Sequence, residues 1–328
     1  MEFVTNIFKF HKFKIVLIFV FALIFGFILF PFGDLSDVVT AKVSEYTGGQ
    51  VYLQFDDLNV SALPAPGVAL TEVLVETQTL PSLKAGELNV RPWILGALMA
   101  KTGLSLDAVD LFGGVVAADY REGDKLKSGE RMKSIAVDAQ GVDLPNLTTF
   151  LRDGGILNMA LEGKIDLSTQ LQVDPVFDDQ PTGNIGFTVN GLTLPSQTMT
   201  VDFNGAAMPL PLPELRLGKT ILAAEMNEGN LRINQLSFGG PAESLSGQIT
   251  GLVAMELRRE NTGVRPVIGG YDLNVDMTLK KEFMAAYGQR FGFVFGMLKG
   301  RRETPQGTRF AFKASLKPGM MLPEITGL

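Results

Sequence analysis

The sequence of 328 residues contains no cysteine and only one histidine, His11. Without cysteine there can be no disulfide, no thiolate metal site and no cysteine nucleophile. With a single histidine, the usual zinc sites and histidine-based acid–base catalysis have almost no residues from which to form. We therefore expect a protein without catalytic activity, although 46% apolar residues are enough for a substantial core.

Basic residues are also in deficit, with 29 Lys and Arg against 35 Asp and Glu. Removing the three Lys and the one Glu of residues 1–14 leaves 26 basic and 34 acidic residues, a net charge of −8. An acidic surface repels phosphate backbones, so we expect no nucleic-acid partner. The usual metal, phosphate and hydrolase motifs are missing, and we interpret the acidic pair Asp178-Asp179 as solvated turn residues. We expect no metal and no cofactor.

One long apolar run lies near the start of the chain. Ile15 to Phe30 reads IVLIFVFALIFGFILF, and two more residues extend the run to Phe32 without a charge. As a helix this run would be about 27 Å long, enough to cross the hydrocarbon core of a bilayer. The three lysines of residues 1–14 predict a cytoplasmic tail, with residues 33–328 across the membrane. The anchor residues that we single out are Ile15, Val16, Leu17, Ile18, Phe19 and Phe30.

A cleaved signal peptide is the alternative interpretation of this run, because signal peptides share the basic flank. The run is longer than an ordinary signal core, and no small-x-small cleavage site follows it. We therefore predict a retained, single-pass transmembrane signal anchor over residues 15–32. One exported domain, residues 33–328, should follow it.

Beyond residue 50 the dominant pattern is an alternation of apolar and polar residues, typical of strands with one buried face. Turn-forming Gly, Asn, Asp and Pro separate the alternating rows. The polar partner face disfavours a doubly wound parallel sheet and predicts an antiparallel, mainly β architecture. The rows are residues 135–139, 157–167, 185–189, 199–203, 231–233, 249–257, 271–279 and 310–316.

Helical patterns are few and short. Residues 35–46 should form a helix that continues away from the membrane, residues 92–100 a short apolar turn of helix, and residues 146–153 a cap between strands. The clearest helix, residues 282–299, should plug one end of the sheet; the alternative is a lid or docking helix. Because these helices are too short to cover a long apolar sheet face, the sheet should curl, close or pack as two layers.

The apolar rows define a candidate interior. It could be filled by side chains, which the short length of the domain favours, or open to hold lipid. The substitution Leu161→Asp would distinguish the two cases. It should destabilise a filled core, because it buries an unpaired charge, but an open groove could tolerate it. The candidate interior residues are Leu157, Met159, Leu161, Leu273, Val275 and Met277.

Residues 58–116 resemble the N-terminal unit of AsmA-like proteins, in which four strand segments with fixed glycines follow an anchor. The matching residues are Pro66, Gly67, Leu70, Val73, Leu83, Ala85, Leu88, Val90, Leu104, Val109, Gly113, Gly114 and Val115.

Residues 215–257 and the ending GTRFAFKASLKPGMMLP resemble the type II secretion system protein N family. Ala314 and Ser315 stand near where that family has Gly-Thr, which is a departure from its pattern. The residues that carry the likeness are Gly229, Leu231, Ile233, Phe238, Gly239, Gly240, Leu245, Gly247 and Ile249.

The resemblance implies a protein of the bacterial inner membrane, with its bulk in the periplasm and a curled, AsmA-like antiparallel sheet. It implies a non-catalytic component of the type II protein secretion system, with other secretion-system proteins as partners. The alternative that it offers is a lipid-binding module that holds or passes phospholipid in the apolar interior of the sheet. We place the secretion role first.

Overall fold

The computed structural model describes residues 35–61, 66–78, 80–155, 157–203, 206–260, 263–288, 291–318, 320 and 323–328. The predicted cytoplasmic tail and the predicted anchor, residues 15–32, lie outside these ranges. Within them, no helix combines the length and the apolar character needed to cross a membrane.

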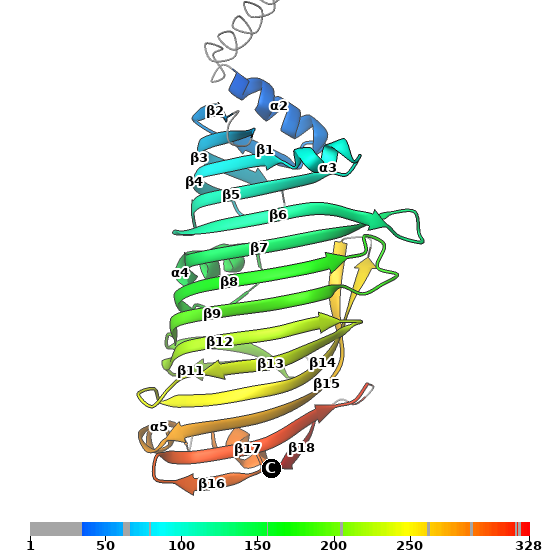
Figure 1. Cartoon of the computed structure of the whole chain (residues 1–328). Coiled ribbons are helices and arrows are strands. Elements are labelled where there is room, and N and C mark those ends of the chain that lie inside the picture. Colours follow the sequence, from blue (N-terminus) through cyan, green and yellow to red (C-terminus); the bar gives the residue numbers. More distant parts are fainter. Residues whose placement is uncertain are drawn as a thin grey trace, which may run out of the picture.

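One antiparallel sheet of sixteen strands dominates the molecule (Figure 1). Its first nine strands are β1 (Val51–Gln54), β2 (Asp57–Ser61), β3 (Gly67–Thr77), β4 (Leu83–Pro92), β5 (Gly103–Leu111), β6 (Gly114–Lys125), β7 (Arg131–Asp143), β8 (Glu162–Val173) and β9 (Thr182–Leu194). The other seven are β12 (Leu215–Asn227), β13 (Asn230–Phe238), β14 (Leu245–Glu260), β15 (Gly263–Lys280), β16 (Arg301–Thr304), β17 (Gly307–Leu316) and β18 (Glu324–Gly327). The prediction of a mainly β, antiparallel architecture is confirmed.

The order of the strands follows the chain. It runs β1-β3-β4-β5-β6-β7-β8-β9-β12-β13-β14-β15-β17-β16, with β2 paired to β3 and β18 paired to β17. Each end of the sheet consists of two short strands that share one long strand. At one end β1 pairs with residues 74–77 of β3 and β2 with residues 67–71. At the other end β16 pairs with residues 307–310 of β17 and β18 with residues 312–315.

A separate two-stranded sheet, β10 (Gln197–Phe203) and β11 (Ala206–Leu212), interrupts the connection between β9 and β12. The pairing Leu194 with Leu215 and the pairing Gln197 with Leu212 keep one register, so this unit continues the β9–β12 hairpin beyond the main sheet. The alternating pattern predicted a strand at residues 199–203 but did not indicate that this strand lies outside the main sheet. Prolines at 209 and 211 lack the backbone N–H that an inner strand needs, which confines β11 to an edge.

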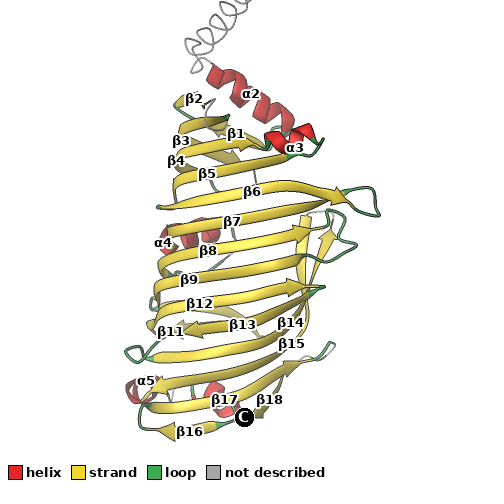
Figure 2. Ribbon diagram, in the orientation of Figure 1, coloured by secondary structure: helices red, strands yellow, loops and turns green. Residues whose placement is uncertain are grey.

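Helices are short and few among the described residues (Figure 2). Three of the four predicted helices are present, and the fourth, over residues 282–299, was wrong because two helices replace it. Gly288 follows the first of them, and its low helix propensity favours the end of the helix there. The helices are α2 (Ser36–Tyr46), α3 (Ile94–Leu98), α4 (Leu144–Asp153), α5 (Lys281–Tyr287) and α6 (Gly292–Met297).

The strand predicted over residues 157–167 begins later than expected. Leu157, Met159 and Leu161 form the connection from α4, and β8 starts at Glu162. The backbone of Ala160 bonds to the side chain of Gln197 rather than to a neighbouring strand. Its N–H donates to Gln197 Oε1 at 2.9 Å, and Gln197 Nε2 donates to its carbonyl at 3.1 Å. A side chain therefore takes the place that a ladder partner would hold.

Clusters of buried apolar side chains lie at the two ends of the sheet. The N-terminal cluster contains Phe55, Leu58, Leu70 and Val73, and Val39 of α2 packs against it. The C-terminal cluster contains Leu279, Phe283, Phe310 and Phe312. In the second cluster, α6 adds Phe295, whose ring stacks on that of Phe310 with centroids 5.8 Å apart. Helices thus cover the sheet at both of its ends.

Candidate functional site: the apolar face of the sheet

The register of the strands places one unbroken line of apolar residues across thirteen strands, from β2 to β17. We call this line the central apolar row. Every member is the direct cross-strand partner of the next, so all of them lie on one face of the sheet. The row consists of Leu58, Leu70, Leu88, Ala108, Val116, Ala139, Leu167, Phe187, Leu222, Leu236, Ile249, Val275 and Phe312.

A second line beside the central row has the same character. It differs from an all-apolar line only at Thr169 and Gly251. Its members are Val60, Val68, Val90, Leu106, Ala118, Val137, Thr169, Ile185, Ala224, Ile233, Gly251, Leu273 and Ala314. We call the surface formed by the two lines the apolar face.

Burial along the central apolar row differs between its ends and its middle. Leu58 and Leu70 at one end and Phe312 at the other are buried within the two clusters. Between these ends only the small Ala108 and Ala139 are buried. The larger side chains in the middle, from Leu88 to Val275, are half-buried. In a filled core the large side chains would be the buried ones, so the middle of the apolar face lacks a complete cover.

Some cover comes from α4. Phe150 of this helix contacts Phe112 with ring centroids 5.3 Å apart, and Leu144 and Thr148 are buried. In Figure 1 this helix and α5 lie behind the sheet. The next line of residues beside the second one extends the apolar face and stays partly open nevertheless. Ile135 of β7, which pairs with Tyr120 and Leu171, is 37% exposed.

The predicted interior residues fall into two groups. Leu273, Val275 and Met277 all lie on β15 and on one face, opposite Ala314, Phe312 and Phe310 of β17. Val275 and Met277 pack against the C-terminal cluster. The other three, Leu157, Met159 and Leu161, lie in the connection before β8. All six are half-buried.

The opposite face of the sheet is polar and carries ion pairs between neighbouring strands. Arg309 of β17 donates to Asp276 of β15 through Nε, at 2.8 Å, and through Nη2. Lys313 of β17 pairs with Asp272 of β15 at 2.8 Å. These hydrogen bonds from the Arg309 guanidinium lower the pKa of Asp276 below its ordinary value. These charged side chains are exposed to solvent. The polar face is therefore well hydrated, whereas exposure of the apolar face to water is unfavourable.

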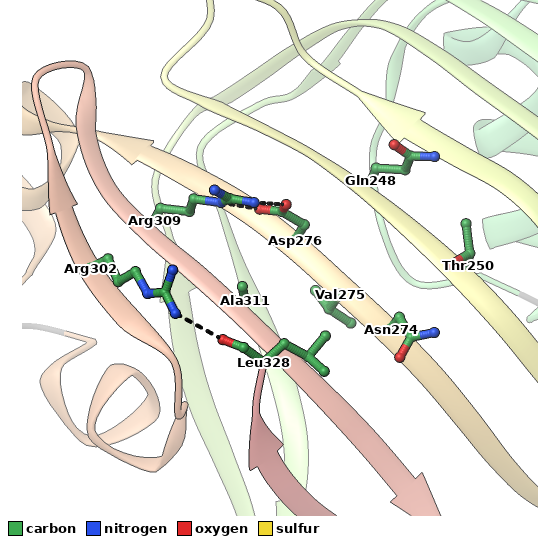
Figure 3. Close-up of a pocket in the computed structure, with 9 residues that line it drawn as sticks. All are labelled: Gln248, Thr250, Asn274, Val275, Asp276, Arg302, Arg309, Ala311 and Leu328. Carbon is green, nitrogen blue, oxygen red and sulfur yellow. Dashed lines mark hydrogen bonds and ion pairs between the residues drawn. The ribbon is translucent and has the colours of Figure 1, made fainter.

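A cavity of about 380 Å³, lined by polar, charged and apolar residues, lies on the polar face (Figure 3). Arg302 and Arg309 are direct cross-strand partners at its margin, and Asp276 neutralises Arg309. Gln248 and Thr250 contribute an amide and a hydroxyl group, and the rest of the lining consists of Asn274, Val275, Ala311 and Leu328. These side chains provide hydrogen-bond donors and acceptors at the cavity.

The acidic pair Asp178-Asp179 lies in the β8–β9 loop, as expected. The side chain of Asp174, which is only 3% exposed, accepts the backbone N–H groups of both residues at 3.0 and 3.2 Å. Asp178 and Asp179 are themselves exposed. In the part of the chain that the structure describes, no three acidic or histidine side chains lie close enough together to hold a metal ion.

Sequence reasoning found the alternation within strands but missed the unbroken rows across them. The rows depend on the register of twelve strand pairs, and in the sequence only the turns between strands carry information about that register.

A search of protein-family models, curated proteins and solved structures finds no match to this chain.

Proposed function

We propose that this protein is a non-catalytic, membrane-anchored module that binds phospholipid acyl chains on the apolar face of its sheet. The observation that carries the proposal is the burial along the central apolar row. Its large side chains are half-buried over the middle of the sheet although both ends are closed by packed clusters. Apolar surface in contact with water costs about 25 cal/mol per Å², which an acyl chain lying on this face would offset.

The dimensions support the same proposal. Thirteen strands at about 4.8 Å spacing give the central apolar row a length of about 58 Å, roughly twice the hydrocarbon thickness of a bilayer. Several acyl chains could lie end to end along it. The polar face, with its ion pairs in water, offers no comparable surface for an acyl chain.

Site-specific photo-crosslinking tests the proposal. A photoreactive amino acid at Leu167, in the central apolar row, should crosslink to labelled phospholipid in intact cells. The matched control is the next residue, Ser168, which lies on the polar face and should crosslink severalfold less. Equal labelling at both positions, or none at Leu167 in a folded protein, would contradict acyl-chain binding. The comparison is independent of lipid that surrounds the predicted anchor, because both probes lie on β8.

The secretion role is a second proposal and rests on the resemblance alone. The likeness spans residues 215–257 and the closing strand, but its glycines also serve the fold. A side chain on Gly247, for example, would come within 2.7 Å of the Asp276 carbonyl. Deleting the gene and measuring secretion of type II substrates tests this role. We now place lipid binding first, because the half-buried apolar face bears on it directly.

A further inference from the structure

The most exposed apolar cluster of the described residues lies on α3 and the residue after it. Leu95 is 68% exposed, Leu98 is 80% exposed and Met99 is 57% exposed, with Ile94 at 46%. Scattered exposed apolar residues are normal, but four within six positions form a patch of the kind that marks a binding surface. The patch does not belong to the apolar face, because α3 lies in the loop between β4 and β5.

Trp93 holds α3 in this orientation. Its ring lies against Gly96, where an added methyl group would overlap the ring. On the other side a methyl group on Gly103 would come within 2.7 Å of Trp93. The guanidinium of Arg121 lies 5.7 Å from the ring centroid. The tryptophan therefore acts as a fixed support, and the apolar side chains of α3 remain outside.

The position of α3 in the molecule suggests what covers the patch. Figure 1 shows α2 and α3 together at the N-terminal end of the sheet. The predicted anchor ends at Phe32 and α2 begins at Ser36, so at most about 14 Å of chain separates them. On α2, Tyr46 is 86% exposed and Val38 is 55% exposed. This end of the sheet therefore combines exposed apolar and aromatic side chains with the shortest path to the anchor.

We propose that α3 docks on the surface of the membrane that holds the anchor, with Leu95 and Leu98 inserted in the interfacial region. Tryptophan and tyrosine are enriched at that depth, which matches Trp93 and Tyr46. The inference rests on the proposed anchor and is independent of acyl chains on the apolar face.

Apolar insertion, not charge, drives this docking. Basic side chains around α3 are already paired with acidic ones. Lys101 lies 2.9 Å from Asp124, and Arg91 pairs with Asp107. Arg121, over the Trp93 ring, lies 3.6 Å from Asp119. Docking should therefore occur on zwitterionic lipid and should depend little on salt, because apolar contacts are not screened.

Trp93 provides the test, because it is the only tryptophan of the chain. The full chain, reconstituted in vesicles of phosphatidylcholine, is compared with the same chain in vesicles of brominated phosphatidylcholine. We expect blue-shifted Trp93 emission and strong quenching by the brominated lipid. The double variant Leu95→Ser, Leu98→Ser should lose most of the quenching and keep its thermal melt, since both side chains are exposed. The control Ile268→Ser, at a position 64% exposed on β15, should keep the quenching.

Three results would overturn the inference. Unquenched Trp93 in a chain that has inserted into the vesicles would contradict the docking of α3 but leave the anchor intact. A photoreactive residue at Leu98 that crosslinks in cells to a protein instead of lipid would identify a protein-docking surface. A chain that fails to insert at all would overturn the anchor and the docking together. Crosslinking at Leu167 reports separately on acyl-chain binding.

Discussion

Arg309 reaches Asp276 diagonally across the β15–β17 ladder, because its direct partner is Thr278. Lys313 reaches Asp272 by the same diagonal four residues further along. The two pairs repeat one geometry, so both are satisfied only in the observed register. A shift by one residue would also bring Phe310 and Phe312 to the polar face. Ion pairs and apolar rows thus specify the same alignment of the two strands.

The Arg309–Asp276 pair predicts a pH-dependent contribution to stability. The pKa of Asp276 is lowered in the folded state from an ordinary value of 3.8, so the contribution is full above about pH 3.8 and is lost as the pH falls below it. Asp276→Asn should lower the melting temperature at pH 7 by less than about 4 °C, because the pair is solvent-exposed. The difference from wild type should shrink below pH 3.8. Asp138→Asn, an exposed change on the same face, is the control; a constant difference down to pH 2 would contradict the prediction.

Replacing a large apolar side chain by alanine should destabilise the protein more at the packed end of the sheet than in its open middle. Phe310 is fully buried, and Phe310→Ala should cost about 3–5 kcal/mol of unfolding free energy. Ile135 is 37% exposed on the apolar face, and Ile135→Ala should cost only about 1–2 kcal/mol. Denaturant unfolding of the two variants measures both values. Equal losses would indicate that the middle is as tightly packed as the end.

Gly96 should not tolerate a side chain, because the Trp93 ring occupies that space. Gly96→Ala is expected to displace the ring, shift the emission of Trp93 and lower the melting temperature. The matched control is Gly292→Ala in α6, where an added methyl group meets no atom within 4 Å. That control should be neutral or stabilising, by up to about 1 kcal/mol. Unchanged Trp93 emission in Gly96→Ala would contradict the close contact.

Gln180 should control the exposure of the outer part of the β14–β15 hairpin. Its amide bonds to both backbone groups of Leu257, accepting from the N–H at 2.8 Å and donating to the carbonyl at 3.2 Å. Gln180→Ala removes both bonds and should increase tryptic cleavage at Arg258 severalfold. Gln172→Ala, an exposed change on β8, should leave the cleavage rate unchanged. Equal rates in all three proteins would show that the hairpin holds its place without this contact.

Much of the fold was predictable from short-range patterns. Alternation identified the strands, and the turn at residues 227–230 joins β12 to β13 as expected, with positive φ at Glu228 and Gly229. The helices over residues 35–46, 92–100 and 146–153 were also found. These features are determined by residues close together in the sequence, and the propensity and periodicity of such residues can be read from the sequence itself.

Features set by distant contacts were not predictable in the same way. The connection at Leu157 to Leu161 alternates like a strand, but Gln197, far along the chain, bonds to its backbone at Ala160. The α3 patch was predicted only as an apolar turn of helix, because exposure depends on how Trp93 packs. The central apolar row required the register of every strand pair, which no single segment contains.

The two short strands at each end of the sheet set its finite length. A long free edge presents a row of unpaired backbone groups to which another chain can add. Here β3 and β17 have that edge occupied by four- and five-residue strands. Copies of this protein should therefore not join through the two ends of the main sheet into a continuous sheet.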